Sequence, residues 1–204
     1  MANIIETLAL ELGQKQAYVE NVVALLDEGN TIPFIARYRK ELHGSMDDTV
    51  LRNLETRLNY LRNLQERKEE ILKAIDSQGK LTEELEKAIS NAATLAETED
   101  IYRPYKQKRR TRATVAKEKG LEPLALLLYA QTGEDPAQAS QDYIDPEKGV
   151  ESAEDALSGA SDIIAEMISD DPEIRKALRE KMERQAMITV QATNPENDSV
   201  YRLY

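Results

Sequence analysis

The chain has 204 residues, 41% hydrophobic and 32% charged, and a formal net charge of −11. It contains no Cys, which excludes a disulfide framework and cysteine-based metal or thiol chemistry. No apolar run approaches the ~20 residues of a membrane helix, and the N-terminus lacks the basic start and unbroken apolar stretch of a signal peptide. We therefore expect a soluble, cytoplasmic protein.

The first forty residues predict three helices. Apolar side chains at helical spacing predict a helix over 4–12, a second over 15–28 and a short third over 32–40. Pro33 falls in the first turn of the third helix, where proline is tolerated. The second and third helices and the turn between them have the proportions of a helix-turn-helix, so we expect a helix-turn-helix-like element over about 14–40.

The third of these helices has two interpretations. Arg37, Arg39 and Lys40 give it positive charge that could contact DNA. The apolar residues Ile32 and Ile35 instead favour a helix that is largely buried, and many helical corners of these proportions bind nothing.

One long helix over about 48–76 is the strongest prediction. Asp47 is placed to cap its first turn, and leucines recur at alternating intervals of three and four residues. Such a helix is either a spine for the other helices or a coiled-coil partner, and the polar far end of its seam favours the spine. The seam consists of Leu51, Leu54, Leu58, Leu61, Gln65, Lys68, Leu72 and Ile75.

Further caps and stops predict helices over most of the remaining chain. Thr82 and Ser152 are expected N-caps, and the pair Asp171-Pro172 is a typical helix start. Pro104 should end the helix that precedes it. The expected helices begin at Thr82, cover 94–102 and 114–119, and begin again at Pro123, Ser152 and Pro172.

The residue pattern changes from helical to strand-like after Met187. Residues 188–193 and 199–204 predict two short strands on either side of a turn. The expected fold is therefore all-α, a multi-helix orthogonal assembly around the central helix, with a small β element at its C-terminal end. We expect residues 1–186 to form the helical region and residues 187–204 a short β segment leading to further domains.

Charge is strongly segregated along the chain. Residues 134–173 contain thirteen acidic residues and only one basic one, Lys148. Residues 103–119 contain a single acid, Glu118, and eight bases: Arg103, Lys106, Lys108, Arg109, Arg110, Arg112, Lys117 and Lys119. A phosphate backbone responds to the field within a Debye length of ~8–10 Å rather than to the net charge, so the acidic total does not exclude nucleic acid.

Two stretches are unlike generic helical sequence. The first is Glu-Gly-Asn-Thr-Ile-Pro-Phe-Ile-Ala-Arg-Tyr-Arg-Lys-Glu over 28–41. The second is Glu-Asp-Ile-Tyr-Arg-Pro-Tyr-Lys-Gln-Lys-Arg-Arg-Thr-Arg-Ala over 99–113, continued by Ala-Lys-Glu-Lys-Gly-Leu-Glu-Pro-Leu over 116–124. Together they resemble the N-terminal region of the Tex family of bacterial transcription accessory proteins. The resemblance extends from about Ile4 to the end, with departures at Arg103 and Gln107.

The resemblance implies a role in transcription with nucleic-acid binding and a helix-turn-helix-like element. Full-length Tex-like proteins continue into a ribonuclease-H-like domain, helix-hairpin-helix units and a C-terminal OB-type RNA-binding domain. Those domains and their functions lie outside these 204 residues.

Two functions remain open. The first is a non-catalytic RNA- or DNA-binding module without sequence preference, in which arginine and lysine contact phosphates and tyrosines stack on bases. The second is a scaffold that docks other domains or the transcription machinery, with the basic residues paired to acidic protein surface. The candidate nucleic-acid contacts are Arg37, Arg39, Lys40, Arg103, Tyr105, Lys106, Lys108, Arg109, Arg110, Arg112 and Lys117.

No residue pattern predicts an enzyme, a cofactor or a metal site. His43 stands alone beside a glycine, and we expect it on the surface. The acidic pairs Asp47-Asp48 and Asp170-Asp171 each precede a predicted helix, so capping explains them. Metalloprotease, phosphate-loop, dinucleotide and calcium-loop spacings are all absent.

Overall fold

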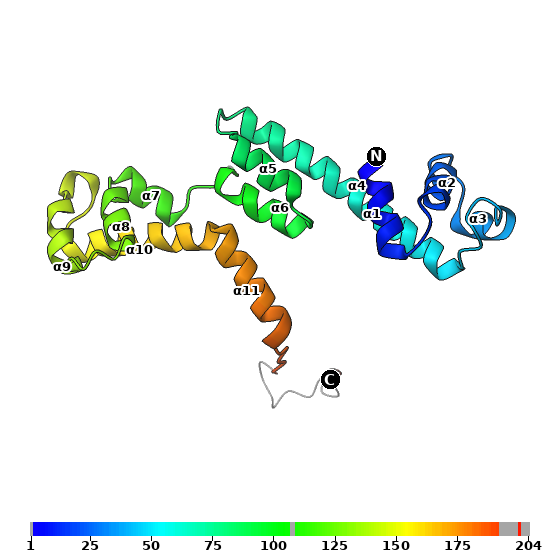
Figure 1. Cartoon of the computed structure of the whole chain (residues 1–204). Helices are drawn as coiled ribbons and strands as arrows, with labels where there is room; N and C mark the ends of the chain where they lie inside the picture. The colour runs from blue at the N-terminus through cyan, green and yellow to red at the C-terminus, as the bar shows by residue number, and fades with distance from the viewer. Residues whose placement is uncertain (1, 107–108, 192–199, 201–204) are drawn as a thin grey trace. The chain divides into compact units, whose positions relative to one another are not determined.

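The computed structural model describes residues 2–106, 109–191 and 200. Over these residues the protein is helical, with no strand and a single isolated bridge between Asp145 and Val150 (Figure 1). The all-α fold class is therefore confirmed. No described helix is both long and apolar enough to cross a membrane.

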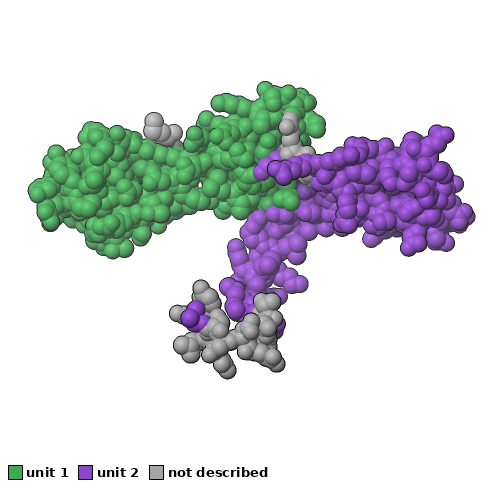
Figure 2. All heavy atoms as spheres, turned by 180° about the vertical axis from the view of Figure 1, so that it is seen from behind, with its two compact units in different colours: residues 1–105 green, residues 106–204 purple. Residues whose placement is uncertain are grey.

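The chain divides into two compact units, residues 1–105 and residues 106–204 (Figure 2). The first unit contains α1 (Ala2–Leu12), α2 (Gln16–Asp27), α3 (Ile32–Tyr38), α4 (Asp48–Asp76), α5 (Glu83–Asn91), α6 (Leu95–Tyr102) and the 3-10 helix η1 (Arg103–Tyr105). The second contains α7 (Arg112–Glu118), α8 (Glu122–Tyr129), α9 (Pro136–Ala139), α10 (Ala153–Asp170), α11 (Pro172–Gln185) and two short 3-10 helices, η2 (Ser140–Tyr143) and η3 (Pro146–Lys148).

Side-chain caps start most of the longer helices where the sequence predicts them. Asp47 Oδ1 accepts a hydrogen bond from the backbone N–H of Val50 at 2.8 Å, so α4 begins at Asp48 as expected. Thr82 caps α5 and Ser152 caps α10 through the same three-residue contact. Each cap satisfies one of the backbone N–H groups that a helix start leaves without a partner.

Helix α4 carries two separate apolar cores in the first unit. Helices α1, α2 and α3 pack on its N-terminal half, around the buried Leu51, Leu54 and Leu58. Helices α5 and α6 pack on its C-terminal half, around the buried Ile71 and Ile75. This arrangement is the spine that the leucine seam favours.

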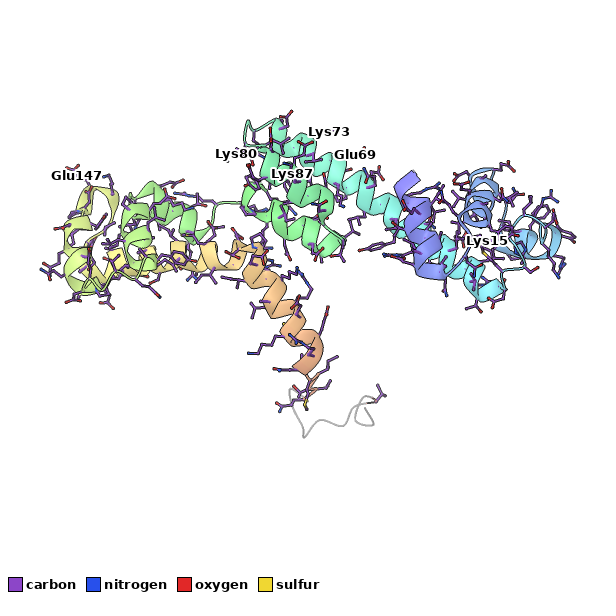
Figure 3. All side chains as sticks on the ribbon, viewed as in Figure 1. Lys15, Glu69, Lys73, Lys80, Lys87 and Glu147 are labelled. Atoms are coloured by element: carbon purple, nitrogen blue, oxygen red, sulfur yellow. The ribbon has the colours of Figure 1, made fainter. Side chains whose placement is uncertain are left out.

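The middle of the expected seam is less buried than its ends. Leu61 is half-buried and Gln65 is exposed, whereas Leu64, outside the seam, is only 5% exposed. The buried stripe therefore shifts around the helix between the two cores, because a straight α-helix drifts relative to a seven-residue repeat. The hairpin of α4 and α5 presents exposed lysines to solvent, labelled in Figure 3: Lys73, Lys80 and Lys87.

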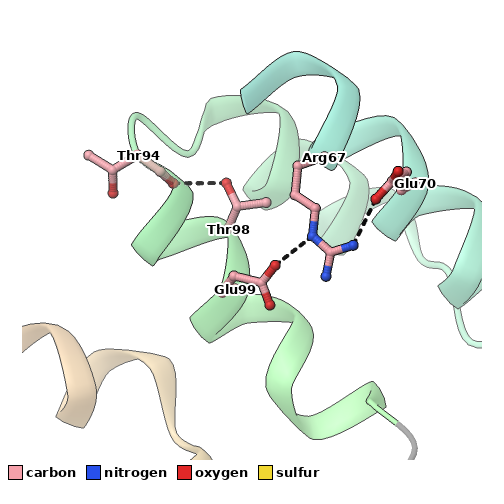
Figure 4. A network of polar contacts seen from close by, with 5 residues as sticks. All are labelled: Arg67, Glu70, Thr94, Thr98 and Glu99. Atoms are coloured by element: carbon pink, nitrogen blue, oxygen red, sulfur yellow. Dashed lines mark hydrogen bonds and ion pairs between the residues drawn. The ribbon is translucent and has the colours of Figure 1, made fainter. Parts of the chain in front are cut away.

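A polar network fixes α6 against α4 beside the second core (Figure 4). Arg67 Nε donates to Glu99 at 2.5 Å, and its Nη1 donates to Glu70 at 2.8 Å. These hydrogen bonds, the one to Glu99 first, raise the pKa of Arg67 above its usual range. The guanidinium also lies over the ring of Tyr102, so one side chain connects α4 to the middle and to the C-terminal end of α6.

Two bidentate ion pairs hold α1 and α2 to α4. Arg57 donates to both carboxylate oxygens of Glu11 at 2.7 Å. Arg62 donates to both oxygens of Asp27, at 2.7 and 2.8 Å. The hydrogen bonds from the arginines hold the pKa of each carboxyl below its usual value.

The second unit is built from small side chains. Helix α10 packs against α7 and α8, and Ala116, Ala156 and Ala160 are buried among them. A Cβ on Gly159 would lie 2.4 Å from Leu121 Cδ1 and 3.3 Å from Ala116 Cβ. A side chain there would require Leu121 to move and Ala116 to shift slightly, so glycine favours the close approach of α7 and α10.

The expected β element is not found where the structure can test it. Residues 186–191 form no regular structure, and Met187, Ile188 and Val190 are at least 83% exposed. A strand needs a partner for its backbone N–H and C=O groups, and the described residues offer none. The rest of that prediction, residues 192–199 and 201–204, lies outside the described residues.

The first core should tolerate no charge. Leu58 is 2% exposed, so Leu58→Asp buries an unpaired carboxylate and should cost several kcal/mol or unfold the first unit. The half-buried Leu61 should give a smaller loss in Leu61→Asp. Thermal and urea unfolding measure the difference. The matched control is Leu10→Asp, since Leu10 is 78% exposed and should change stability by no more than about 0.5 kcal/mol. Equal stability of all three variants would contradict the buried seam.

Acid should weaken the first unit through the two carboxylates paired to α4. The folded-state pKa values of Glu11 and Asp27 lie below their unfolded values, so their contribution is complete above the unfolded pKa and is lost as the pH falls through the folded pKa. Glu11→Gln with Asp27→Asn should lower the urea midpoint at neutral pH and flatten its decline in acid. Glu6→Gln, an exposed carboxylate without an ion pair to a described residue, should leave the pH profile unchanged.

Candidate nucleic-acid interface

Helix α7 carries two basic residues of the candidate interface, Arg112 and Lys117, and Arg109, Arg110 and Lys119 flank it in sequence. Ala113 and Ala116 are buried against α10, which leaves the longer side chains of α7 facing solvent. Thr111 caps the helix and donates from its hydroxyl to Glu166 on α10 at 3.1 Å. The small residues thus anchor α7 while its basic face stays exposed.

Two of the expected contact residues are exposed and lack a partner. Lys106 and Arg109 make no ion pair or hydrogen bond with any residue that the structure describes. Lys108, which lies between them in sequence, falls outside the described residues. These two side chains therefore present their charge to solvent.

Three further bases pair with carboxylates of the same unit. Arg110 contacts Glu118 at 2.7 Å, and Arg112 contacts Asp162 at 3.3 Å. The side chains of Arg110 and Arg112 remain 69% and 88% exposed, and such surface pairs contribute only about 0–1 kcal/mol. Lys117 contacts two carboxylates at longer range: Glu122 at 3.7 Å and Glu166 at 3.9 Å.

A hollow of about 440 Å³ opens beside these residues, between α7 and α10. Its rim includes Arg110, Arg112 and Lys119, and its floor includes Leu121 and small side chains of both helices. Lys119 Nζ donates to the carbonyl of Gly149 at 2.6 Å. No group of three or more acidic or histidine side chains is placed to hold a metal ion in the described part of the chain.

Arg103 and Tyr105 belong to the first unit, in η1. Arg103 is exposed, whereas Tyr105 is partly buried and packs against the core of Ile71, Ile75 and Ile89. These two residues therefore belong to a different compact unit from α7.

The remaining expected contacts lie at the end of α3. Arg37 and Lys40 are exposed, and Arg39 is half-buried with its guanidinium 5.2 Å from the ring centre of Phe34. Ile32 and Ile35 are buried, so one face of α3 packs inward and the other carries the positive charge. This face lies in the first unit and forms a candidate surface separate from α7.

His43 is buried, which corrects the expectation of a surface histidine. It is 1% exposed, and neither ring nitrogen has a hydrogen-bond partner among the described residues. The turn around it packs against α2: a Cβ on Gly44 would lie 2.3 Å from the ring of Tyr18, and Asn21 donates to the carbonyl of Leu42 at 3.0 Å. Local sequence suggested an open turn, but contacts with a distant helix cover it.

Sequence reasoning missed the far wall of the hollow. Asp155, Ser158, Gly159 and Asp162 line it from α10. Their spacing of three and four residues places them along one face of a helix. A polar stripe at that spacing, within a helix already predicted from its cap, was the signal available in the sequence.

Comparison with known protein families shows to which family the chain belongs. Residues 2–76 match the Tex-like protein N-terminal domain, and residues 131–203 match the Tex central region-like family. The chain belongs to the Tex family. Its match to "Protein tex" of Bordetella pertussis is 49% identical over 181 residues, 89% of this chain and 23% of that protein.

Two further relatives carry informative names. The chain is 44% identical to "Transcriptional accessory protein Tex" of Neisseria gonorrhoeae over 189 residues, 93% of this chain and 25% of that protein. It is 35% identical to "S1 RNA-binding domain-containing protein 1" of Homo sapiens over 161 residues, 78% of this chain and 16% of that protein. The chain spans about a quarter of the length of the bacterial relatives it matches.

Removing the buried imidazole should not destabilise the first unit. His43→Leu replaces two unsatisfied nitrogens by an apolar group of similar size, so the free energy of unfolding should stay level or rise by about 1 kcal/mol. His43→Ala is the control and should lower it, because it leaves a cavity. Urea unfolding measures both variants. A clear loss in His43→Leu would show that the ring makes a polar contact essential to the fold.

Proposed function

We propose that this chain is a non-catalytic nucleic-acid-binding module of a Tex-like transcription accessory protein. Its main contact is the basic segment of the second unit, Lys106 to Lys119. Binding is electrostatic, directed at the phosphate backbone of RNA or DNA, and without sequence preference. The observation that carries the proposal is the exposure of Lys106 and Arg109 with no partner among the described residues.

The neighbouring ion pairs do not prevent such binding. Arg110 and Arg112 are paired but mostly exposed, and an exposed pair is weak enough for a phosphate to replace the carboxylate. Arg112 retains N–H donors beyond its single contact with Asp162, because a guanidinium carries five. The acidic residues of α10 lower the affinity and keep it dependent on salt.

A protein scaffold is the second candidate. Lys117, Arg110 and Arg112 all pair with acidic side chains of their own unit, as expected if the basic residues serve the fold. Leu178 and Met182 on α11 are also 54% and 64% exposed, which suits docking to protein. Here the partners are other domains of the full-length protein or the transcription machinery.

Several further assignments rest on the same proposal. The other contact candidates form secondary surfaces: Arg37 in α3 with Arg39 and Lys40 just after it, and Arg103 and Tyr105 in η1. Residues 1–186 form the Tex-like helical region, and residues 187–204 lead toward the remaining domains of a longer protein. The name of the human relative includes an S1 RNA-binding domain, which supports RNA as one ligand. A role in transcription favours a location in the bacterial cytoplasm.

Removing the two unpaired bases should weaken all oligonucleotides alike. If about four bases contact phosphates, the log–log salt slope of the wild type should be about −3 to −4. Lys106→Ala with Arg109→Ala should lower affinity at low salt for RNA and DNA and flatten the slope by about one to two units. Fluorescence anisotropy over a salt series measures both quantities.

The control changes net charge equally at another surface. Lys80→Ala with Lys87→Ala removes two exposed lysines from the α4–α5 hairpin (Figure 3) and should leave affinity and slope close to wild type. A loss as large as that of the first variant would assign binding to general charge or to the hairpin. Absence of binding by the wild type at low salt would favour the scaffold.

A further inference from the structure

The hollow between α7 and α10 is lined by three kinds of surface. Its volume of about 440 Å³ lies within the ~300–1,000 Å³ typical of small-ligand sites. Its rim carries basic residues, its floor is apolar, and its α10 wall carries hydrogen-bond acceptors. Each surface restricts the chemistry of the ligand.

The basic rim selects an anionic group. Arg110, Arg112 and Lys119 reach it from α7 and from its flanking residues. Lys119 uses one of its three N–H donors on the carbonyl of Gly149, so it can still donate to a ligand. Arg112 is 88% exposed, which lets its guanidinium turn toward an incoming phosphate.

The floor selects a flat apolar body. Val115 is half-buried, Ala116 and Leu121 are buried, and Gly159 adds no side chain. The small residues that let α7 and α10 approach closely also leave space above them, because their side chains are short. Pockets that hold an unstacked base are lined by aromatic or by apolar side chains, and this floor is of the apolar kind.

The acidic wall excludes a simple anion. Asp155 and Asp162 line the hollow from α10, with one oxygen of Asp162 3.3 Å from Arg112, and these carboxylates would disfavour inorganic phosphate or an acidic peptide. A carboxylate instead accepts hydrogen bonds from base amino groups or from a ribose hydroxyl. Oδ2 of Asp155 is occupied by Ser152 and by the N–H of Glu151, so its second oxygen is the acceptor available.

We infer that this hollow binds one unpaired nucleotide of a single-stranded nucleic acid. Its phosphate lies at the basic rim, its base on the apolar floor and its polar edge against Asp155 or Asp162. The inference rests on the proposed function and narrows it to single strands, because a base within a duplex has its edge paired and its faces stacked. Lys106 and Arg109 contact neighbouring phosphates outside the hollow.

A neutral substitution that fills the hollow tests the inference. Ser158 lines the hollow, whereas Ser161 is exposed on the same helix and does not line it. Ser158→Tyr should lower affinity for a single-stranded oligonucleotide about tenfold, the contribution of one stacked base, without changing the salt slope. Ser161→Tyr should bind as wild type. Circular dichroism confirms that both variants fold, and a duplex of equal length and a free mononucleotide are titrated in parallel.

Measurements on the unmodified protein keep the inference testable if Ser158→Tyr does not fold. A single strand carrying thiouridine should photo-crosslink to residues 155–162 or 115–121. The single strand should bind more tightly than a duplex of equal length. The free mononucleotide should bind more weakly than the single strand. Four results would each overturn it: equal affinity for duplex and single strand, a mononucleotide that binds as tightly as the strand, crosslinks confined to residues 103–109, or wild-type affinity of a folded Ser158→Tyr. If Lys106→Ala with Arg109→Ala still weakens binding in those cases, the proposed function stands without the hollow; absence of any binding removes both.

Discussion

The first unit depends on the apolar stripe of α4. Leu51 and Leu54 on one half and Ile71 and Ile75 on the other are completely buried, and each pair belongs to a different core. Neither the α1–α3 group nor the α5–α6 pair has another long helix to pack on. Burial of a leucine or isoleucine contributes about 1.5–3 kcal/mol, so α4 carries much of what stabilises both groups.

Between and beside the cores, arginines of α4 determine which helix packs where. Arg57, Arg62 and Arg67 contact carboxylates on α1, α2 and α6 respectively. Each pair is partly exposed and individually weak, but bidentate geometry is directional. The apolar stripe therefore supplies most of the stabilisation, and the arginines favour one arrangement of the packed helices.

In the second unit, the small residues at the contact between α7 and α10 explain both the close packing of the helices and the exposure of the basic side chains. Ala116 and Gly159 let α7 lie directly against α10. That contact uses the small residues of α7, so its long basic side chains stay outside, and the low floor of the hollow remains beside them. Acidic residues of the same unit then lie within reach of the bases: Glu118 pairs with Arg110, and Asp162 of α10 pairs with Arg112.

Local sequence was sufficient to predict most of the helices and several of their starts. Capping by Asp47, Thr82 and Ser152 and the periodicity of α4 involve residues within one or two turns of each other, so short-range chemistry is sufficient. It also determined that residues 103–119 are basic and that the family resemblance lies in two extended motifs.

Only the tertiary structure decided which of these side chains are accessible. Burial of His43 depends on α2, the partial burial of Tyr105 on α4 and α5, and the pairing of Arg112 on α10. Asp162 is fifty residues from Arg112 in sequence, and no local pattern specifies that contact. The exposure of side chains, their ion pairs and the hollow depend on which segments pack together, because burial involves several helices at once. Caps and helical periodicity, by contrast, are properties of a single helix.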